Sequence, residues 1–187
     1  SPELIIAIVT ILLTVAYAYA NGMNDAANAI ATVISTRVLS PFVAIVMGSI
    51  MNFVGALSGT AVAKTIGKGI IDPDQITQVT VMSAVLAAVI WVFVATRFGY
   101  PVSVSHSLIA GVLGSGIATA GFAAVNFATI QKVMTALALS PVLGMMGGFA
   151  FMLFLYWILK GVRPTTVSKI FGKMQLIASV FLAFSHG

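Results

Sequence analysis

The chain has 187 residues, of which 60% are hydrophobic and only 7% are charged. A soluble domain usually carries about a quarter charged residues, so this sequence could not cover a globular surface with polar groups and is expected to have lipid as its solvent. The net charge of +5 comes from basic residues that sit singly or in pairs at the ends of apolar runs, which argues against a nucleic-acid partner. The absence of cysteine excludes disulfides and thiol chemistry.

Apolar runs long enough to span a bilayer follow one another along the chain. A spanning helix needs about 20 mostly apolar residues. Such runs cover residues 4–20, 41–63, 76–96, 102–125 and 133–159, and a sixth begins near Met174. The alternating segments of an outer-membrane barrel are not visible. We therefore expect an all-α polytopic protein of the cell (plasma or inner) membrane, with about five transmembrane helices, some discontinuous, and the start of a sixth.

The first polar cluster interrupts the apolar sequence after residue 20. Asn21, Asp25 and Asn28 are spaced by four and three residues and would share one face of a helix, with Asn24 beside them. Gly22 permits local unwinding. An ionised aspartate at membrane depth costs at least ~2.5–3.5 kcal/mol, so it normally faces a partner or a watery cavity. The alternative is a short first helix followed by a solvated loop, but residues 26–34 remain apolar and compatible with a helix.

The ligand types in this cluster indicate the kind of ion that it would bind. One carboxylate, several amide oxygens and loosened backbone carbonyls suit a hard cation. They are poor ligands for a soft transition metal. The sequence therefore predicts a cation site around Asp25.

The second polar cluster opens the run at residues 102–125. Pro101 suits the first turn of a helix, and Ser103, Ser105, His106 and Ser107 follow it. A helix start with free N–H groups and hydroxyls is an anion site that suits phosphate. The alternative is that Ser103 caps the helix while the other serines bond to carbonyls. The imidazole of His106 could relay protons or orient its neighbours.

Together the two clusters outline a symport mechanism. No lysine or arginine falls in the middle of a span, so the charge of a bound phosphate must be offset by helix ends and co-bound cations. Ionised Asp25 would repel phosphate and is expected to hold a cation beside it. The rival interpretations are a channel, a phosphate-reporting receptor, and an intramembrane hydrolase that uses Ser105 or Ser58 with His106. Adjacent residues 105 and 106 point about 100° apart on a helix, which is poor geometry for a nucleophile and its base.

A short internal repeat suggests that the chain is one half of a duplicated transporter. Residues 18–22 (AYANG) resemble residues 183–187 (AFSHG) at an offset of 165 residues. Repeated halves are common in secondary transporters. We therefore expect residues 1–187 to form the N-terminal repeat half, with the second repeat beginning near Met174.

Three segments resemble the inorganic phosphate transporter (PiT) family. Residues 21–29 (NGMNDAANA) resemble its G-A-N-D-V-A-N-A signature, and residues 101–111 resemble its P-V-S-x-T-H-x-x-x-G segment, with the glycine one place later, at Gly111. Residues 59–72 also resemble this family. The departures are Met23 and Ala26 in the signature, Ser105 in place of a common threonine, and Asn52 where many members carry a glutamate.

The resemblance implies two halves in opposite orientation, a central site between broken helices, coupling to sodium or to protons, and a homodimer. It implies a transporter and not an enzyme, with sodium as the expected coupling ion because the ligands are oxygen atoms, and with no other cofactor. The expected phosphate-binding residues are Asn24, Ser103, Ser105, His106 and Ser107, and the expected sodium ligands are Asn21, Gly22, Asp25, Asn28 and Asn52. If residues 102–125 cross the membrane, the positive-inside rule places Ser1 outside.

Overall fold

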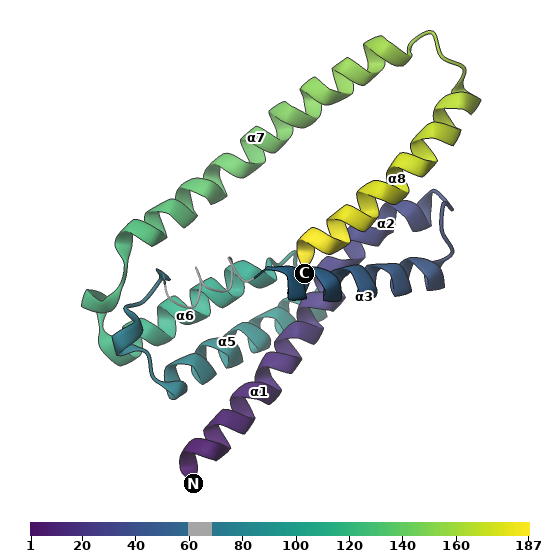
Figure 1. The fold of residues 1–187 in the computed structure, drawn as a ribbon. Coiled ribbons are helices and arrows are strands. Elements are labelled where there is room, and N and C mark those ends of the chain that lie inside the picture. Colours follow the sequence, from purple (N-terminus) through teal and green to yellow (C-terminus); the bar gives the residue numbers. More distant parts are fainter. Residues whose placement is uncertain (60–68) are drawn as a thin grey trace.

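The computed structural model describes residues 1–59 and 69–187. Within these residues the regular structure is helical, and the one β-type pairing is an isolated bridge between Ile71 and Val125. The order of elements is visible in Figure 1, which runs from α1 at the N-terminus to α8 at the C-terminus. The all-α fold class is confirmed.

The first two helices form one continuous rod. α1 (Pro2–Asn21) runs through a π-helical turn, η1 (Gly22–Ala26), into α2 (Ala27–Ser35), and the whole apolar segment has 34 residues. The helix departs from α-helical geometry at Gly22, where the sequence predicted that local unwinding is permitted, and the alternative of a solvated loop is wrong. The polar residues stay within the helix because they find local partners: Nδ2 of Asn24 donates to the Ala20 carbonyl over 2.9 Å.

Among the residues that the structure describes, five helices are long and apolar enough to cross a membrane. They are the continuous rod Pro2–Ser35, α3 (Pro41–Ser58), α5 (Gln78–Arg97), α7 (Phe127–Leu159) and α8 (Pro164–His186). The chain is therefore a multi-pass membrane protein. Residues 60–63 of the predicted second run, and 60–68 of the family-like segment 59–72, lie outside the described residues.

Helix α8 begins earlier than the apolar run suggested. It starts at Pro164, about ten residues before Met174, and therefore includes Lys169 and Lys173. Both lysines are exposed, and their long stems can carry the charged heads away from apolar surroundings. Apolar composition alone missed this first part of the helix.

Helix α6 (Val104–Ala120) is shorter than the predicted span at residues 102–125. It has 17 residues, or roughly 26 Å at 1.5 Å per residue, against a hydrocarbon core of about 30 Å. Gly121, with a φ of 75°, ends the helix. The chain then forms a short turn, η3 (Phe122–Ala124), and Val125 pairs with Ile71 near a second short turn, η2 (Pro73–Gln75).

α5 and α6 form a hairpin whose tip meets the middle of the Pro2–Ser35 rod (Figure 1). Val92 and Val104 pack against Ala20 in a buried cluster, and Tyr17 and Val102 pack around this cluster. The start of α6 therefore lies beside the midpoint of a spanning helix and not at its end. The structure does not support the expected crossing at residues 102–125, because α6 is too short and is one arm of a hairpin whose tip lies beside the rod.

Helix α8 returns to the π-helical turn. It packs along α3 and α2, and its last turn ends beside η1. Gly55 of α3 permits this approach, because a Cβ atom there would overlap the Phe184 carbonyl of α8. The close crossing of small residues is a common way of packing helices in membranes.

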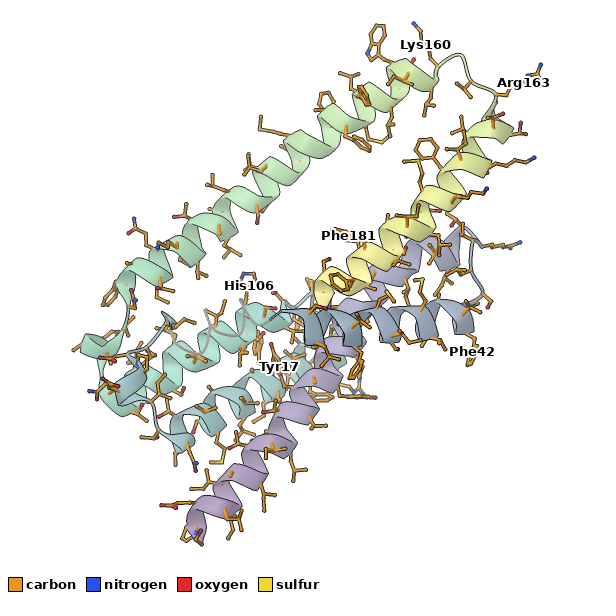
Figure 2. The ribbon with its side chains drawn as sticks, viewed as in Figure 1. Tyr17, Phe42, His106, Lys160, Arg163 and Phe181 are labelled. Carbon is orange, nitrogen blue, oxygen red and sulfur yellow. The ribbon has the colours of Figure 1, made fainter. Side chains whose placement is uncertain are left out.

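Helix α7 stands apart from the other helices in Figure 1 and has no buried residue. Figure 2 shows Lys160 and Arg163 at the turn that joins α7 to α8. The Lys160 ammonium lies 4.9 Å from the centre of the Trp157 ring. A tryptophan beside basic residues is typical of a helix end at the membrane surface.

Candidate functional site

The carboxylate of Asp25 lies in the π-helical turn, inside the Pro2–Ser35 rod and about two-thirds of the way along it. Its Oδ2 atom is 3.2 Å from Nε2 of His186, at the end of α8. Both side chains are about one-quarter exposed. Asp25 thus has the partner that an aspartate at this depth requires, and the partner comes from the far end of the chain.

A cavity beside this pair contains several of the predicted sodium ligands. Asn21 and Gly22 of the rod and Asn52 of α3 line it, together with His186. Asn21, Gly22 and Asn52 are each partly exposed, so they can reach an ion from water. Amide oxygens from two helices beside one carboxylate form a suitable set of hard-cation ligands.

Two predicted residues lie elsewhere. Asn28 is exposed and does not line the cavity that holds Asn21 and Asn52. The side chain of Asn24 faces the hairpin: its Nδ2 donates to the Ala20 carbonyl, and its Oδ1 accepts from the Thr96 hydroxyl over 3.1 Å. Asn24 therefore joins the rod to α5 in this structure.

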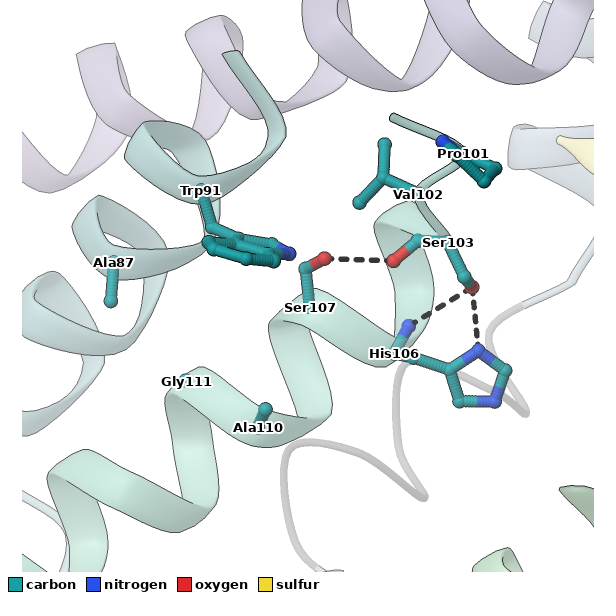
Figure 3. Close-up of a pocket in the computed structure, with 9 residues that line it drawn as sticks. All are labelled: Ala87, Trp91, Pro101, Val102, Ser103, His106, Ser107, Ala110 and Gly111. Atoms are coloured by element: carbon teal, nitrogen blue, oxygen red, sulfur yellow. Dashed lines mark hydrogen bonds between the residues drawn. The ribbon is translucent and has the colours of Figure 1, made fainter. Parts of the chain in front are cut away.

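The second candidate site is a cavity at the start of α6 (Figure 3). Ser103, His106 and Ser107 line it, with Trp91 of α5 and Pro101 among the other lining residues. The cavity therefore has two hydroxyls and an imidazole at the N-terminal end of a helix. This combination of donors and a helix dipole favours an anion.

Local hydrogen bonds fix the polar groups of this cavity. Ser103 caps α6, because its Oγ accepts from the His106 backbone N–H over 3.4 Å. The same Oγ lies 2.6 Å from Nδ1 of His106, and the Ser107 hydroxyl donates to the Ser103 carbonyl over 2.8 Å (Figure 3). Capping and back-bonding, which were the alternative interpretation of the serines, are thus both present in the structure.

Ser105 is exposed and lies outside this cavity. The hydrolase interpretation required Ser105 or Ser58 beside His106. The structure instead pairs His106 with Ser103, and the Ser58 hydroxyl donates to the Val54 carbonyl of its own helix. The proposed nucleophiles therefore do not meet the proposed base.

Sequence reasoning missed His186 as a candidate site residue. The repeat offset of 165 residues pairs Asn21 with His186, so the signal was present in the repeat. Its Nδ1 atom is buried and, within the described part of the chain, has no hydrogen-bond partner. A buried polar atom of this kind calls for an explanation, and one is that it faces a ligand or a further part of the protein.

These features define a multi-pass membrane protein with polar cavities at the centre of its helices. A family model described as "Phosphate transporter family" matches residues 21–187, and the chain belongs to this family. The match begins at the first residue of the cluster around Asp25 and covers both candidate sites.

Individual relatives carry the same description. A "Probable low-affinity inorganic phosphate transporter" from Bacillus subtilis is 38% identical over 98% of this chain, which covers 56% of that protein. A protein of the same description from Streptomyces halstedii is 36% identical over 99% of this chain and 87% of its own length. The chain spans about half the length of the first of these and of a similar Rhizobium meliloti protein.

One solved structure has the same arrangement of helices. It is described as "The sodium-dependent phosphate transporter", with a TM-score of 0.76 and 26% identity. The similarity covers 97% of this chain and 55% of that protein.

Proposed function

We propose that this chain is the N-terminal half of a symporter that carries inorganic phosphate together with sodium. The observation that carries this proposal is the Asp25 carboxylate in a π-helical turn inside a spanning helix, next to a cavity lined by the amides of Asn21 and Asn52. π-helical turns are rare and occur frequently at functional sites. The family and the sodium-dependent structural relative support the same assignment.

In this proposal sodium binds near Asp25, with ligands from Asn21, Gly22 and Asn52. Phosphate binds at the start of α6, with Ser103, His106 and Ser107 around it. The cation offsets part of the anion's charge, since no lysine or arginine among the described residues lines either cavity. The two sites are on elements that touch at the hairpin tip, so one conformational change can act on both.

The rest of the transporter completes the assembly that we propose. A second half, beginning within α8 and opposite in orientation, would supply further ligands, and two copies would form a homodimer. The turn between α7 and α8, with its basic residues and Trp157, would face the cytoplasm.

Proton-coupled symport of phosphate, or of a metal–phosphate complex, is the second candidate. The contact that favours it is the Asp25–His186 pair, because both side chains can bind a proton. An anion channel is the third candidate, and it would show no coupled exchange.

Uptake of labelled phosphate into proteoliposomes that contain the full-length transporter tests these alternatives. We expect uptake to rise steeply with an inward sodium gradient at fixed pH. Uptake that ignores sodium and follows a pH gradient would replace sodium with protons. If no counterflow with unlabelled phosphate is observed, the remaining interpretation is an anion channel.

The cation site has its own test in Asp25→Asn. Loss of the carboxylate charge should abolish sodium-coupled uptake while the protein remains folded in the membrane. Asp74→Asn is the matched control, because Asp74 undergoes the same chemical change while lying exposed in η2, outside the spans. Wild-type sodium dependence in Asp25→Asn would contradict the assignment.

A further inference from the structure

Two hydrogen bonds connect the candidate cation site with the candidate phosphate site. The hydroxyl of Tyr17, in α1, donates to the Val104 carbonyl in the first turn of α6 over 3.1 Å. The hydroxyl of Thr96, in the last turn of α5, donates to Oδ1 of Asn24 over 3.1 Å. Each bond joins residues more than 70 positions apart, so both belong to the tertiary fold and not to a single helix.

The two bonds accompany a tightly packed apolar contact. Ala20 of the rod, Val92 of α5 and Val104 of α6 form one cluster, and each is at most 1% exposed. Tyr17 packs against this cluster (Figure 2). Close-packed contacts of this kind transmit displacement, because the atoms have no free volume into which they can relax.

Each bond holds a residue that is the immediate neighbour of a candidate ligand. Val104 follows Ser103, the cap of α6, and Asn24 precedes Asp25 in the π-helical turn. A movement of the turn when a cation binds would therefore be carried to the hairpin, and a movement of the hairpin would be carried back.

We propose that Tyr17 and Thr96 are positioning residues through which sodium binding raises the affinity for phosphate. This inference rests on the proposed function and adds the route by which the two sites act together. Neither residue lines the cavities described above, so neither is assigned a contact with the ions. The coupling is reciprocal: if sodium raises the affinity for phosphate, phosphate must raise the affinity for sodium by the same factor.

The quantity that tests this inference is the ratio of two phosphate dissociation constants. They are measured by titration calorimetry on the purified full-length transporter, once with sodium replaced by choline and once with saturating sodium. Tyr17→Phe and Thr96→Val each remove a hydroxyl and keep the shape of the side chain. Because one hydrogen bond is lost in each, we expect the ratio to fall about two- to tenfold in either variant, with affinity in choline little changed.

Two control variants separate the hydrogen bonds from general effects of substitution. Thr96→Ser keeps the hydroxyl and should keep the wild-type ratio. Tyr156→Phe makes the same change as Tyr17→Phe on α7, at a side chain that is 67% exposed and lines neither cavity, and should also keep it. Thermal unfolding midpoints show that each protein is folded, and Tyr17→Phe decides the question if Thr96→Val does not fold.

The outcomes distinguish this inference from the function beneath it. Wild-type ratios in Tyr17→Phe and Thr96→Val overturn the coupling role and leave sodium-coupled transport standing. An equal loss of affinity with and without sodium also overturns it, because that result indicates a structural role alone. Wild-type protein whose phosphate affinity ignores sodium overturns the proposed sodium coupling and this inference together.

Discussion

The closest approach between α5 and α6 occurs at Gly111, and a methyl group there should force the hairpin apart. A Cβ atom on Gly111 would lie 2.5 Å from the Ala84 carbonyl oxygen and 3.2 Å from its carbon. Ordinary contacts of a Cβ atom are 3.4 Å or longer, and both of these atoms belong to the backbone. Gly111→Ala therefore requires one helix to shift, and no rotation of a side chain can relieve the overlap.

The expected cost follows from two opposing effects. Overpacking of a filled interior typically costs about 1–3 kcal/mol. Replacing glycine by alanine within a helix returns about 1 kcal/mol through helix propensity. Gly114→Ala, on the same helix, receives only the favourable effect, because nothing lies within 4 Å of its Cβ position. The two variants should thus differ in free energy of unfolding by about 1–3 kcal/mol, with Gly111→Ala the less stable.

Unfolding in sodium dodecyl sulfate, followed by circular dichroism on the full-length transporter, measures this difference. Phosphate affinity should also fall in Gly111→Ala, since Gly111 lines the cavity that holds Ser103 and His106. Equal free energies of unfolding for the two alanine variants would refute the close approach of α5 and α6.

Two further substitutions test the helix starts. Ser103→Ala removes both the cap of α6 and a hydroxyl from the cavity, and loss of one charge-assisted hydrogen bond should weaken phosphate binding by about 1.5–3 kcal/mol. Ser105→Ala, outside the cavity, should weaken phosphate binding much less. If both variants bind phosphate as tightly as the wild type, the serines have no role in phosphate binding. Asn126 caps α7 by accepting from the Thr129 N–H over 3.1 Å, so Asn126→Ala should lower the free energy of unfolding by about 0.5–2 kcal/mol, and Asn126→Ser should recover most of it.

The sequence predicted the helical fold class and most of the long helices because apolar length is a strong signal in a membrane protein. It did not predict where the helix within the apolar run 102–125 ends. Residues 102–125 were interpreted as a single span, yet Gly121 adopts a positive φ and the next residues pair with Ile71 and its neighbours. That bend depends on a contact between distant segments, which composition does not reveal.

The candidate sites, too, could be predicted from the sequence only in part. Ser103, His106 and Ser107 were predicted together with Ser105 because all of them follow Pro101 at a helix start, where free N–H groups and hydroxyls suit an anion. The spacing of residues cannot show that His186 reaches Asp25, or that Tyr17 reaches Val104, because these contacts form only when α8 and the hairpin pack against the rod. Local sequence patterns therefore found the residues on each helix, and tertiary packing decided their partners.

The π-helical turn that begins at Gly22 also affects the position of Asn28. In a uniform α-helix Asn21, Asp25 and Asn28 would share one face, but a π-helical turn contains more residues than an α-helical turn. Residues after the turn are consequently rotated about the helix axis relative to those before it. This rotation accounts for the exposure of Asn28, while Asn21 lines the cavity with Asn52 of α3. The same turn keeps the backbone hydrogen-bonded where a break would have exposed it, so the rod can carry a carboxylate inside its length and still span the membrane as one helix.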